Sequence, residues 1–259
     1  MNNNVRIMML GDISGSGGMG ALFLGLSSII REKNVDFVIA NGENSSAGFG
    51  ISPDDYYAMK KLGINVITSG NHIWQKEDIF PIMEKNDDIL RPCNYPEPCV
   101  GSGYTIKSCL GKEIGVINLQ GRINMMPIDD PFRKADAVLR EIRKRTPFVF
   151  VDFHAESTDE KEALGFYLDG RVTAVVGTHT HVQTADEKIL PNGTAYISDL
   201  GLTGVQHQVI GSRPDKAIER QFTQLPMKSE VAEGKASVQG VIIEADAKGK
   251  AISIERFTY

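Results

Sequence analysis

The segment RVTAVVGTHTH (171–181) runs from an almost entirely apolar stretch into two histidines that lie two residues apart. An unbroken run of small and β-branched residues is typical of a strand that is buried on both faces of a parallel sheet. Residues i and i+2 of an extended chain point to the same side, so His179 and His181 can face one point. Taken alone, the segment favours two loop histidines that face solvent. The remainder of the chain has to supply the reason for another interpretation.

Similar apolar segments recur along the chain and alternate with helical patterns. Strands are predicted at VRIMML (5–10), DFVIA (36–40), INVITSG (64–70), EIGVINL (113–119) and PFVFVDF (147–153). Helices are predicted at residues 21–33, 52–63, 129–145 and 157–170, from the spacing of apolar residues and from capping residues. This alternation implies parallel strands that are covered by helices.

The final part of the chain has a different pattern. Residues 235–257 predict an antiparallel hairpin that turns at DAKGK (246–250). The segment RPCNYPEPCVGSGY (91–104) is rich in proline and glycine and predicts a loop. No linker, internal repeat or low-complexity segment divides the sequence. We therefore predict one α/β domain over residues 1–259, with largely parallel sheets and an antiparallel hairpin at its end.

The composition excludes several classes of function. The 259 residues carry a net charge of −5 and no long basic stretch, whereas binding to duplex nucleic acid needs a basic stripe. Cys93, Cys99 and Cys109 match neither a disulfide framework nor a zinc pattern, which is typical of reduced thiols in the cytoplasm. No segment is apolar for long enough to form a signal-peptide core or to cross a bilayer. We expect a cytoplasmic protein that binds neither duplex nucleic acid nor membranes.

Polar side chains directly follow five of the predicted strands. The set comprises Asp12, Glu43 with Asn44, Asn71 with His72, His154, and His179 with His181. The carboxyl ends of parallel strands lie along one edge, where α/β proteins bind ligands. Each residue alone has an ordinary role in a turn, in a cap or in the core. Five strand ends that each carry a metal-competent group indicate a shared site.

The mixture of side chains indicates the kind of site. Without thiolates a closed structural zinc site is disfavoured, and carboxylate, amide and imidazole ligands suit iron, manganese or zinc. The number of groups fits two metal ions that share a bridging carboxylate. Two dications exceed the charge of two carboxylates, so the site favours an anionic phosphoester. The glycine-rich GDISGSGGMG (11–20) lacks the ending of a P-loop, and we expect it to form a turn that lets Asp12 reach the metal.

The order of these motifs resembles that of the calcineurin-like metallophosphoesterase superfamily. That superfamily usually opens with Asp-x-His and has GD at its second motif, whereas this chain has no histidine two residues after Asp12 and has NGEN at 41–44. Both departures resemble the YmdB family of 2′,3′-cyclic-nucleotide phosphodiesterases. The segments that carry the resemblance are NGEN, GNHIW, RPCNYP, NLQGR, DDPF, DFHAE, GTHTHVQTAD and TAYISDLG. It implies a calcineurin-like sandwich of largely parallel sheets that is flanked by helices.

The resemblance also implies a role for each residue at the predicted edge. One metal ion would be held by Asp12, Glu43, Asn44 and His181, and the other by Glu43, Asn71, His154 and His179, with Glu43 as the bridge. Asn44 would replace the imidazole of the missing Asp-x-His motif. His72 has no ligand role and is the candidate to stabilise the transition state or to protonate the leaving ribose oxygen. Arg122 in NLQGR could contact phosphate or form a surface ion pair.

These assignments predict a dinuclear phosphodiesterase that hydrolyses 2′,3′-cyclic nucleotides to 3′-nucleotides through a metal-activated hydroxide. Three alternatives stay open. They are a phosphoesterase that acts on 3′,5′-cyclic nucleotides, phosphoproteins or RNA ends, a regulator that binds metal or nucleotide without turnover, and a metal-dependent amide hydrolase. The last fits the ligands but not the resemblance. Iron, manganese and zinc all accept the ligand set, and we expect a homo-oligomer.

Overall fold

The computed structural model describes residues 4–227 and 229–259, and two β-sheets packed face to face form its centre. The first sheet has the order β14-β13-β1-β3-β4. Its strands are β14 (Ala251–Thr258), β13 (Gln239–Ala245), β1 (Val5–Leu10), β3 (Phe37–Asn41) and β4 (Val66–Thr68). β1, β3 and β4 are parallel, and the hairpin of β13 and β14 extends them in antiparallel sense through β1.

The second sheet has the order β5-β6-β7-β8-β10-β9. Its strands are β5 (Tyr104–Cys109), β6 (Lys112–Gln120), β7 (Val149–His154), β8 (Ala174–Thr178), β10 (Ala195–Ile197) and β9 (Lys188–Ile189). The four central strands, from β6 to β10, are parallel, and an antiparallel strand closes each edge. This sheet therefore points its carboxyl ends in one direction.

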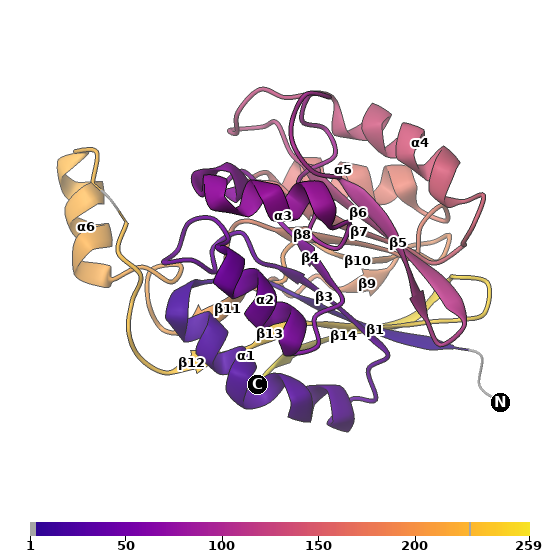
Figure 1. Ribbon diagram of the computed structural model, residues 1–259, viewed down its shortest axis with the longest axis horizontal. Helices are drawn as coiled ribbons and strands as arrows, with labels where there is room; N and C mark the ends of the chain where they lie inside the picture. Colours follow the sequence, from indigo (N-terminus) through magenta and orange to yellow (C-terminus); the bar gives the residue numbers. More distant parts are fainter. Residues whose placement is uncertain (1–3, 228) are drawn as a thin grey trace.

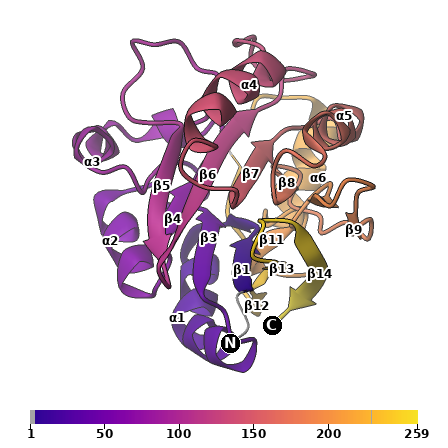
Figure 2. The same ribbon diagram turned by 90° about the vertical axis from the view of Figure 1, so that its right-hand side faces the viewer.

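Helices cover the outer face of each sheet, as Figure 2 shows in a view along the layers. The first sheet carries α1 (Gly15–Glu32) and α2 (Pro53–Lys61), and the second carries α4 (Pro131–Ile142) and α5 (Thr158–Leu168). Two short turns of 3-10 helix, η1 (Ile73–Gln75) and η2 (Glu77–Ile79), lead from β4 into α3 (Phe80–Lys85). The result is a four-layer sandwich.

The alternation of side chains along β1 shows how the layers are held together. Ile7 and Met9 lie in the apolar core between the two sheets, together with residues of β7 and β8. Met8 and Leu10 point to the other face and pack against α1. Successive residues of a strand face opposite sides, so a strand that is apolar throughout is buried on both faces.

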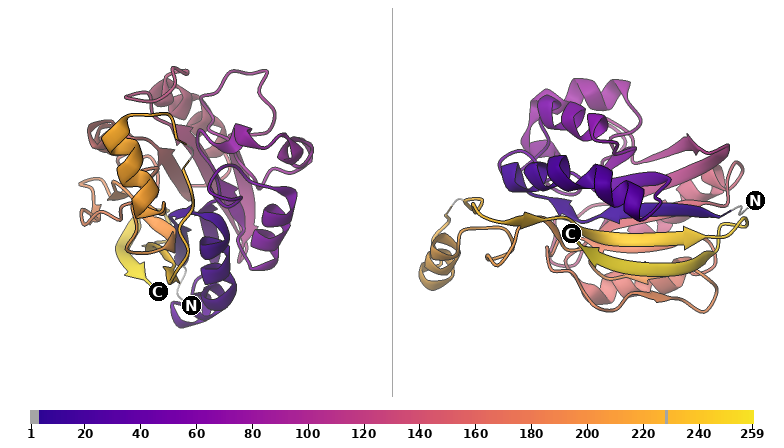
Figure 3. Two further views of the ribbon diagram at one scale, coloured as in Figure 1. Left: turned by 90° about the vertical axis from the view of Figure 1, so that its left-hand side faces the viewer. Right: turned by 90° about the horizontal axis from the view of Figure 1, so that it is seen from below.

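A third, small sheet joins the sandwich to a projecting segment. It has the order β12-β11-β2, with β12 (Ala236–Ser237), β11 (Leu202–Val205) and β2 (Asp12–Ile13). Residues 206–235, which we call the arm, leave the body between β11 and β12 and carry α6 (Pro214–Thr223). Figures 1 and 3 show α6 standing clear of the sandwich.

The predicted fold class is confirmed, and so are the predicted strands, the four helices and the terminal hairpin, with shifts of a few residues at their ends. The expectation of a turn over residues 11–20 is wrong, because α1 begins at Gly15. A side chain at Gly18 would overlap the carbonyl oxygen of Thr203 in β11. The glycines therefore serve close packing of a helix against a strand, which no local turn pattern reveals.

No helix in the described parts of the chain combines the length and the hydropathy that are needed to cross a membrane.

The glycines of α1 provide a matched pair of substitutions. Gly18→Ala should lower the free energy of unfolding by about 1–3 kcal/mol, because the new methyl group overpacks the contact with β11. Gly20→Ala, where a methyl group meets nothing within 4 Å, should raise it by about 0.5–1 kcal/mol through helix propensity. Urea unfolding of the two variants measures both changes. Equal effects of the two substitutions would contradict the packing role of Gly18.

Candidate metal centre

The structure brings the predicted ligand residues together at the carboxyl ends of the parallel strands. Asp12 opens β2, one residue beyond the end of β1, and His154 is the last residue of β7. Glu43 and Asn71 follow β3 and β4 within three residues, and His179 follows β8 directly. Because both sheets end at the same side of the sandwich, residues from both converge on one point.

The imidazole of His154 lies at the middle of this group. Its Nε2 atom is 3.1 Å from Glu43 Oε1, 3.2 Å from Asn71 Oδ1 and 3.0 Å from His179 Nδ1. Donor atoms of Glu43, His154 and His179 all lie within 4.8 Å of one another, which is a spacing that could hold a metal ion. A side chain at Gly70 would overlap the His154 ring, so the glycine of the GNH motif makes room for that ring.

A second group of donors lies around Asp12. Its Oδ2 atom accepts a hydrogen bond of 3.1 Å from the backbone N–H of His179. Its Oδ1 atom is completely buried and has no hydrogen-bond partner among the described residues. That atom lies 3.8 Å from His181 Nε2 and 4.0 Å from His154 Nδ1. A buried carboxylate oxygen without a donor is costly unless a cation balances it.

Glu43 connects the two groups. Its Oε1 atom is 3.1 Å from His154 Nε2, 3.3 Å from His72 Nδ1 and 3.4 Å from Asn44 Nδ2. Its Oε2 atom accepts a hydrogen bond of 3.0 Å from the backbone N–H of His72. The side chain is only 1 % exposed. This central position is the one that a bridging carboxylate needs.

The pKa values of these groups show how the charges balance one another. Burial raises the pKa of Asp12. Burial also acts to raise the pKa of Glu43, but the imidazoles of His154 and His72 hold it well below its usual range. Burial alone would lower the pKa of His154, yet Glu43 and Asp12 raise it to about 9. Burial and the neighbouring His154 lower the pKa of His179 to about 3. A protonated imidazole thus offsets the buried carboxylates, in the place where a cation would do so.

The donor set fits metal ions, with one condition on Asn44. Two buried carboxylates, an amide oxygen from Asn71 and converging imidazole nitrogens are ligands that iron, manganese and zinc accept. The Asn44 amide places Nδ2 at 3.0 Å from His181 Nε2 and Oδ1 at 2.7 Å from His72 Nδ1. Binding a metal through the Asn44 oxygen requires the amide to be turned over, which exchanges two atoms of similar size.

The loop that carries His179 and His181 is held in a conformation that L-residues rarely adopt. The two histidines have φ angles of 103° and 63°. Between them, the N–H of Thr180 donates to Asp199 Oδ2 over 3.1 Å. The same oxygen accepts a hydrogen bond of 2.8 Å from Lys161 Nζ, and both side chains of this ion pair are at most 2 % exposed. A left-handed backbone persists where surrounding contacts over-determine it.

A buried polar network supports His154 from behind. Its Nδ1 atom is 3.0 Å from the hydroxyl of Thr178, which donates to Asp152 Oδ1 over 2.7 Å. Thr68 and Asn41 donate to the other oxygen of Asp152. Burial raises the pKa of Asp152 to about 6. Such partners fix the orientation of a ligating imidazole and keep Nε2 directed at the centre.

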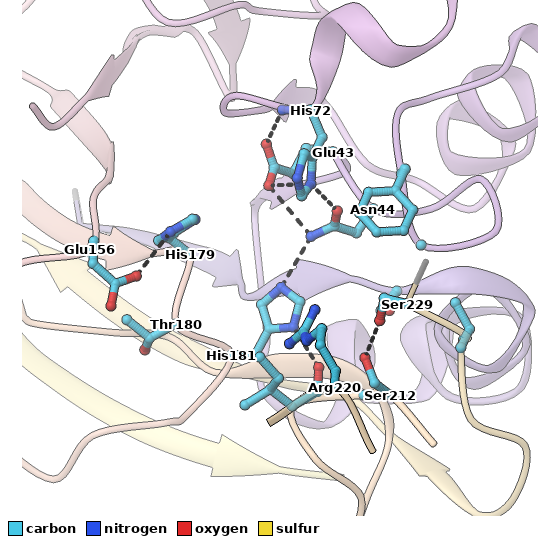
Figure 4. Close-up of a pocket in the computed structure, with 16 residues that line it drawn as sticks. Glu43, Asn44, His72, Glu156, His179, Thr180, His181, Ser212, Arg220 and Ser229 are labelled. Atoms are coloured by element: carbon cyan, nitrogen blue, oxygen red, sulfur yellow. Dashed lines mark hydrogen bonds and ion pairs between the residues drawn. The ribbon is translucent and has the colours of Figure 1, made fainter. Parts of the chain in front are cut away.

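A cavity of about 370 Å³ opens beside the converging residues. Glu43, Asn44, His72, His179 and His181 contribute to its lining, and Figure 4 shows their side chains around it. The remaining wall comes from the start of α1, the loop after β3 and the arm. Its residues are Ser14, Gly48, Phe49, Ile210, Gly211, Ser212, Arg220, Ser229 and Val231, and Glu156 and Thr180 lie beside the histidines. The volume lies within the range of small-molecule sites.

The predicted phosphate contact Arg122 does not line this cavity. Its guanidinium lies 3.4 Å from Asp130 Oδ2 and its side chain is 42 % exposed, which favours the alternative of a surface ion pair. Two charged residues of the cavity lining, Glu156 and Arg220, have no place in the sequence-based interpretation. Glu156 pairs with His179 Nε2 at 3.1 Å and stands two residues after His154 in the DFHAE motif, where its position could have pointed to it. Arg220 belongs to an unpredicted helix and carries no such signal.

Comparison with known proteins decides the family. The model of the family described as YmdB-like protein matches residues 8–257. The chain belongs to the YmdB-like family. It is 47 % identical to the 2′,3′-cyclic-nucleotide 2′-phosphodiesterase of Bacillus subtilis (strain 168) over 253 residues, which cover 97 % of this chain and 96 % of that relative.

Solved structures place the YmdB-like fold among the phosphoesterases. The crystal structure of a novel phosphatase from Mycoplasma pneumoniae superposes with a TM-score of 0.93 at 32 % identity, covering 100 % of this chain and 94 % of that one. A 5′-nucleotidase precursor from Thermus thermophilus gives a TM-score of 0.61 at 15 % identity, covering 98 % of this chain and 54 % of that one. The latter likeness concerns the fold alone, and it agrees with the predicted metallophosphoesterase sandwich.

The position of Glu43 predicts that it is needed for metal binding. Glu43→Gln should lower the metal content of the protein, because a neutral amide cannot balance the charge of a cation held beside it. Glu156→Gln is the control, since it removes a charge at the same cavity but only contacts the outward nitrogen of His179. Elemental analysis of dialysed, folded protein measures the metal content. Unchanged metal content in Glu43→Gln would contradict the assignment.

The buried ion pair behind the histidine loop makes a second prediction. Lys161→Met leaves the Asp199 carboxylate buried without its counter-ion and should lower the free energy of unfolding by about 3–5 kcal/mol. Lys188→Met, which breaks an exposed pair with Glu162 of α5, the helix that carries Lys161, should cost less than about 1 kcal/mol. Urea unfolding compares the two. A small effect at Lys161 would show that the pair does not hold the loop.

Proposed function

We propose that this protein is a dinuclear metal-dependent phosphodiesterase that hydrolyses 2′,3′-cyclic nucleotides to 3′-nucleotides. The observation that carries the proposal is the buried Glu43 carboxylate between two groups of donors, at the edge of an open cavity. The Bacillus subtilis relative is a 2′,3′-cyclic-nucleotide 2′-phosphodiesterase, and its activity supports the choice of substrate. The reaction adds water to phosphorus, breaks the bond from phosphorus to the 2′ oxygen and returns a proton to that oxygen.

The residues divide into two sets that would each hold one ion. Asp12, Asn44 and His181 form one set, Asn71, His154 and His179 form the other, and Glu43 is shared between them. When bound, two such ions supply positive charge to the phosphoryl oxygens and lower the pKa of water, whichever of iron, manganese or zinc is present. The Asp12 oxygen that has no donor among the residues of the described structure, and the converging nitrogens, support this division.

His72 is the residue best placed to handle a proton. Its Nδ1 atom faces Asn44 Oδ1 at 2.7 Å and Glu43 Oε1 at 3.3 Å, whereas its Nε2 atom has no hydrogen bond with any described residue. The ring lies at the cavity and packs edge-on against Phe49, with 4.9 Å between the ring centroids. We assign to Nε2 the transfer of a proton to the leaving 2′ oxygen.

The orientation of Asn44 sets which nitrogen of His72 carries the proton. If the amide is turned over so that its oxygen faces the metal ions, Nδ2 donates to His72 Nδ1 in place of the present contact. The neutral ring then carries its proton on Nε2, which is the atom left for the substrate. One amide would thus serve as a ligand and would also orient the proton donor.

The cavity supports a small-molecule substrate. Its volume of about 370 Å³ suits a nucleotide more than a folded protein partner. The three cysteines are free, in keeping with the cytoplasm as the site of action. A homo-oligomer stays a prediction.

Hydrolysis of a substrate panel tests the proposal. Metal-loaded protein should release 3′-nucleotide from 2′,3′-cyclic nucleotides faster than it hydrolyses 3′,5′-cyclic nucleotides, a phosphopeptide or RNA with a terminal phosphate. Preference for another member of the panel would replace the substrate assignment. Tight nucleotide binding without hydrolysis of any member would instead favour a regulator that binds without turnover.

The role of His72 predicts a separation of metal binding from rate. His72→Ala should keep the metal content of the wild type, since the imidazole is not assigned as a ligand, and should lower kcat by about 10²–10⁴-fold. Elemental analysis and steady-state kinetics on one preparation measure both quantities. Loss of metal would make His72 a ligand, and normal turnover would remove it from the mechanism.

A further inference from the structure

The arm is connected directly to the candidate metal centre. Its base is closed by the pairing of β11 with β12 and by a hydrogen bond from Gln206 N–H to the carbonyl of Lys235. The carbonyl oxygen of Ile210, in the arm, lies 2.9 Å from His181 Nδ1. This contact leaves His181 Nε2 facing Asp12 and Asn44. The arm therefore helps to orient a predicted metal ligand.

Contacts within the arm give it a defined shape beside the cavity. The hydroxyl oxygens of Ser212 and Ser229, from its two legs, are 2.6 Å apart. The backbone N–H of Ala232 donates to the carbonyl of Gly211 over 2.9 Å. Arg213 at the start of α6 pairs through its side chain with Glu230 on the returning leg. These bonds fix the two legs of the arm relative to each other and to the start of α6.

Arg220 extends from α6 to this cavity. Among the described residues that line it, Arg220 is the one lysine or arginine, and Figure 4 shows it with His181, Ser212 and Ser229 around the hollow. The other cations at α6 are paired, Arg213 with Asp215 and Glu230, and Lys216 with Glu219. Arg220 forms no ion pair with any residue that the structure describes. Its positive charge is thus available to an anion in the cavity.

We propose that Arg220 is a substrate-binding residue, whose guanidinium binds phosphoryl oxygens of the phosphoester in the cavity. A planar guanidinium donates two parallel hydrogen bonds to phosphate, and it keeps its charge at every physiological pH. The proposal rests on the proposed phosphoesterase function but not on the identity of the nucleotide. It makes the arm a part of the substrate site, which the sandwich alone does not complete.

Binding of inorganic phosphate to the manganese-loaded protein tests this role. Arg220→Ala should weaken phosphate binding by about tenfold or more, because a charge-assisted contact is lost, while the metal content stays unchanged. Arg220→Lys should retain part of the affinity, since it keeps the charge without the fork. Lys216→Ala is the control, because it removes a positive charge from the same helix outside this cavity.

In kinetic assays, Arg220→Ala should have a higher KM for 2′,3′-cyclic AMP than the wild type. Free guanidinium added to the assay should partly reverse that rise in KM. Phosphate affinity equal to that of the wild type in Arg220→Ala would overturn the proposal, and so would an equal loss in Lys216→Ala. The phosphate titration does not depend on which phosphoester is hydrolysed. A wild type that binds phosphate through Arg220 but leaves cyclic nucleotides intact would refute the substrate assignment alone.

Discussion

The burial of the Glu43 carboxylate is the constraint on which the rest of the site depends. The group is almost completely excluded from solvent, and the basic side chains that face it are imidazoles. A buried charge has to be balanced. Within the chain itself the balance comes from His154, whose pKa the neighbouring carboxylates raise to about 9. Metal ions at the same place would release that proton and leave the imidazole free to ligate. Metal binding is thus an alternative way of balancing the negative charge that the fold buries at Glu43.

The sandwich explains how residues so far apart in the chain meet at one carboxylate. Parallel strands place the residues at their carboxyl ends along one edge, and packing two such sheets face to face brings two edges together. Further contacts hold the loop of His179 and His181 at this edge. His179 and His181 take left-handed backbone angles, while Asp12 and Asp199 accept hydrogen bonds from the N–H groups of His179 and Thr180. The Lys161–Asp199 pair and the Asp152 network then act as rigid supports rather than as participants in the reaction.

Much of this arrangement could be predicted from the sequence, and the successes have a common cause. An apolar strand followed by a polar residue is a local pattern, and the geometry of parallel sheets converts it into a position in space. The failures concern contacts that no local pattern encodes. Gly18 lies in a helix and packs closely against β11, which follows it nearly two hundred residues later in the chain. Arg220 reaches the cavity from an arm whose course depends on pairing between β11 and β12. For Arg122 the sequence left a phosphate contact and a surface ion pair open, and the structure shows the ion pair with Asp130. The single domain and the ligand roles stay predictions.

Anomalous diffraction from crystals of the metal-loaded protein, combined with elemental analysis of the same batch, shows whether Glu43 lies between two metal ions. A dinuclear centre that shares Glu43 should give two anomalous peaks per chain, on either side of the Glu43 carboxylate, one near Asp12 and His181 and the other near His154 and His179. A single peak away from Glu43, or metal-replete crystals in which these side chains contact no ion, would contradict it.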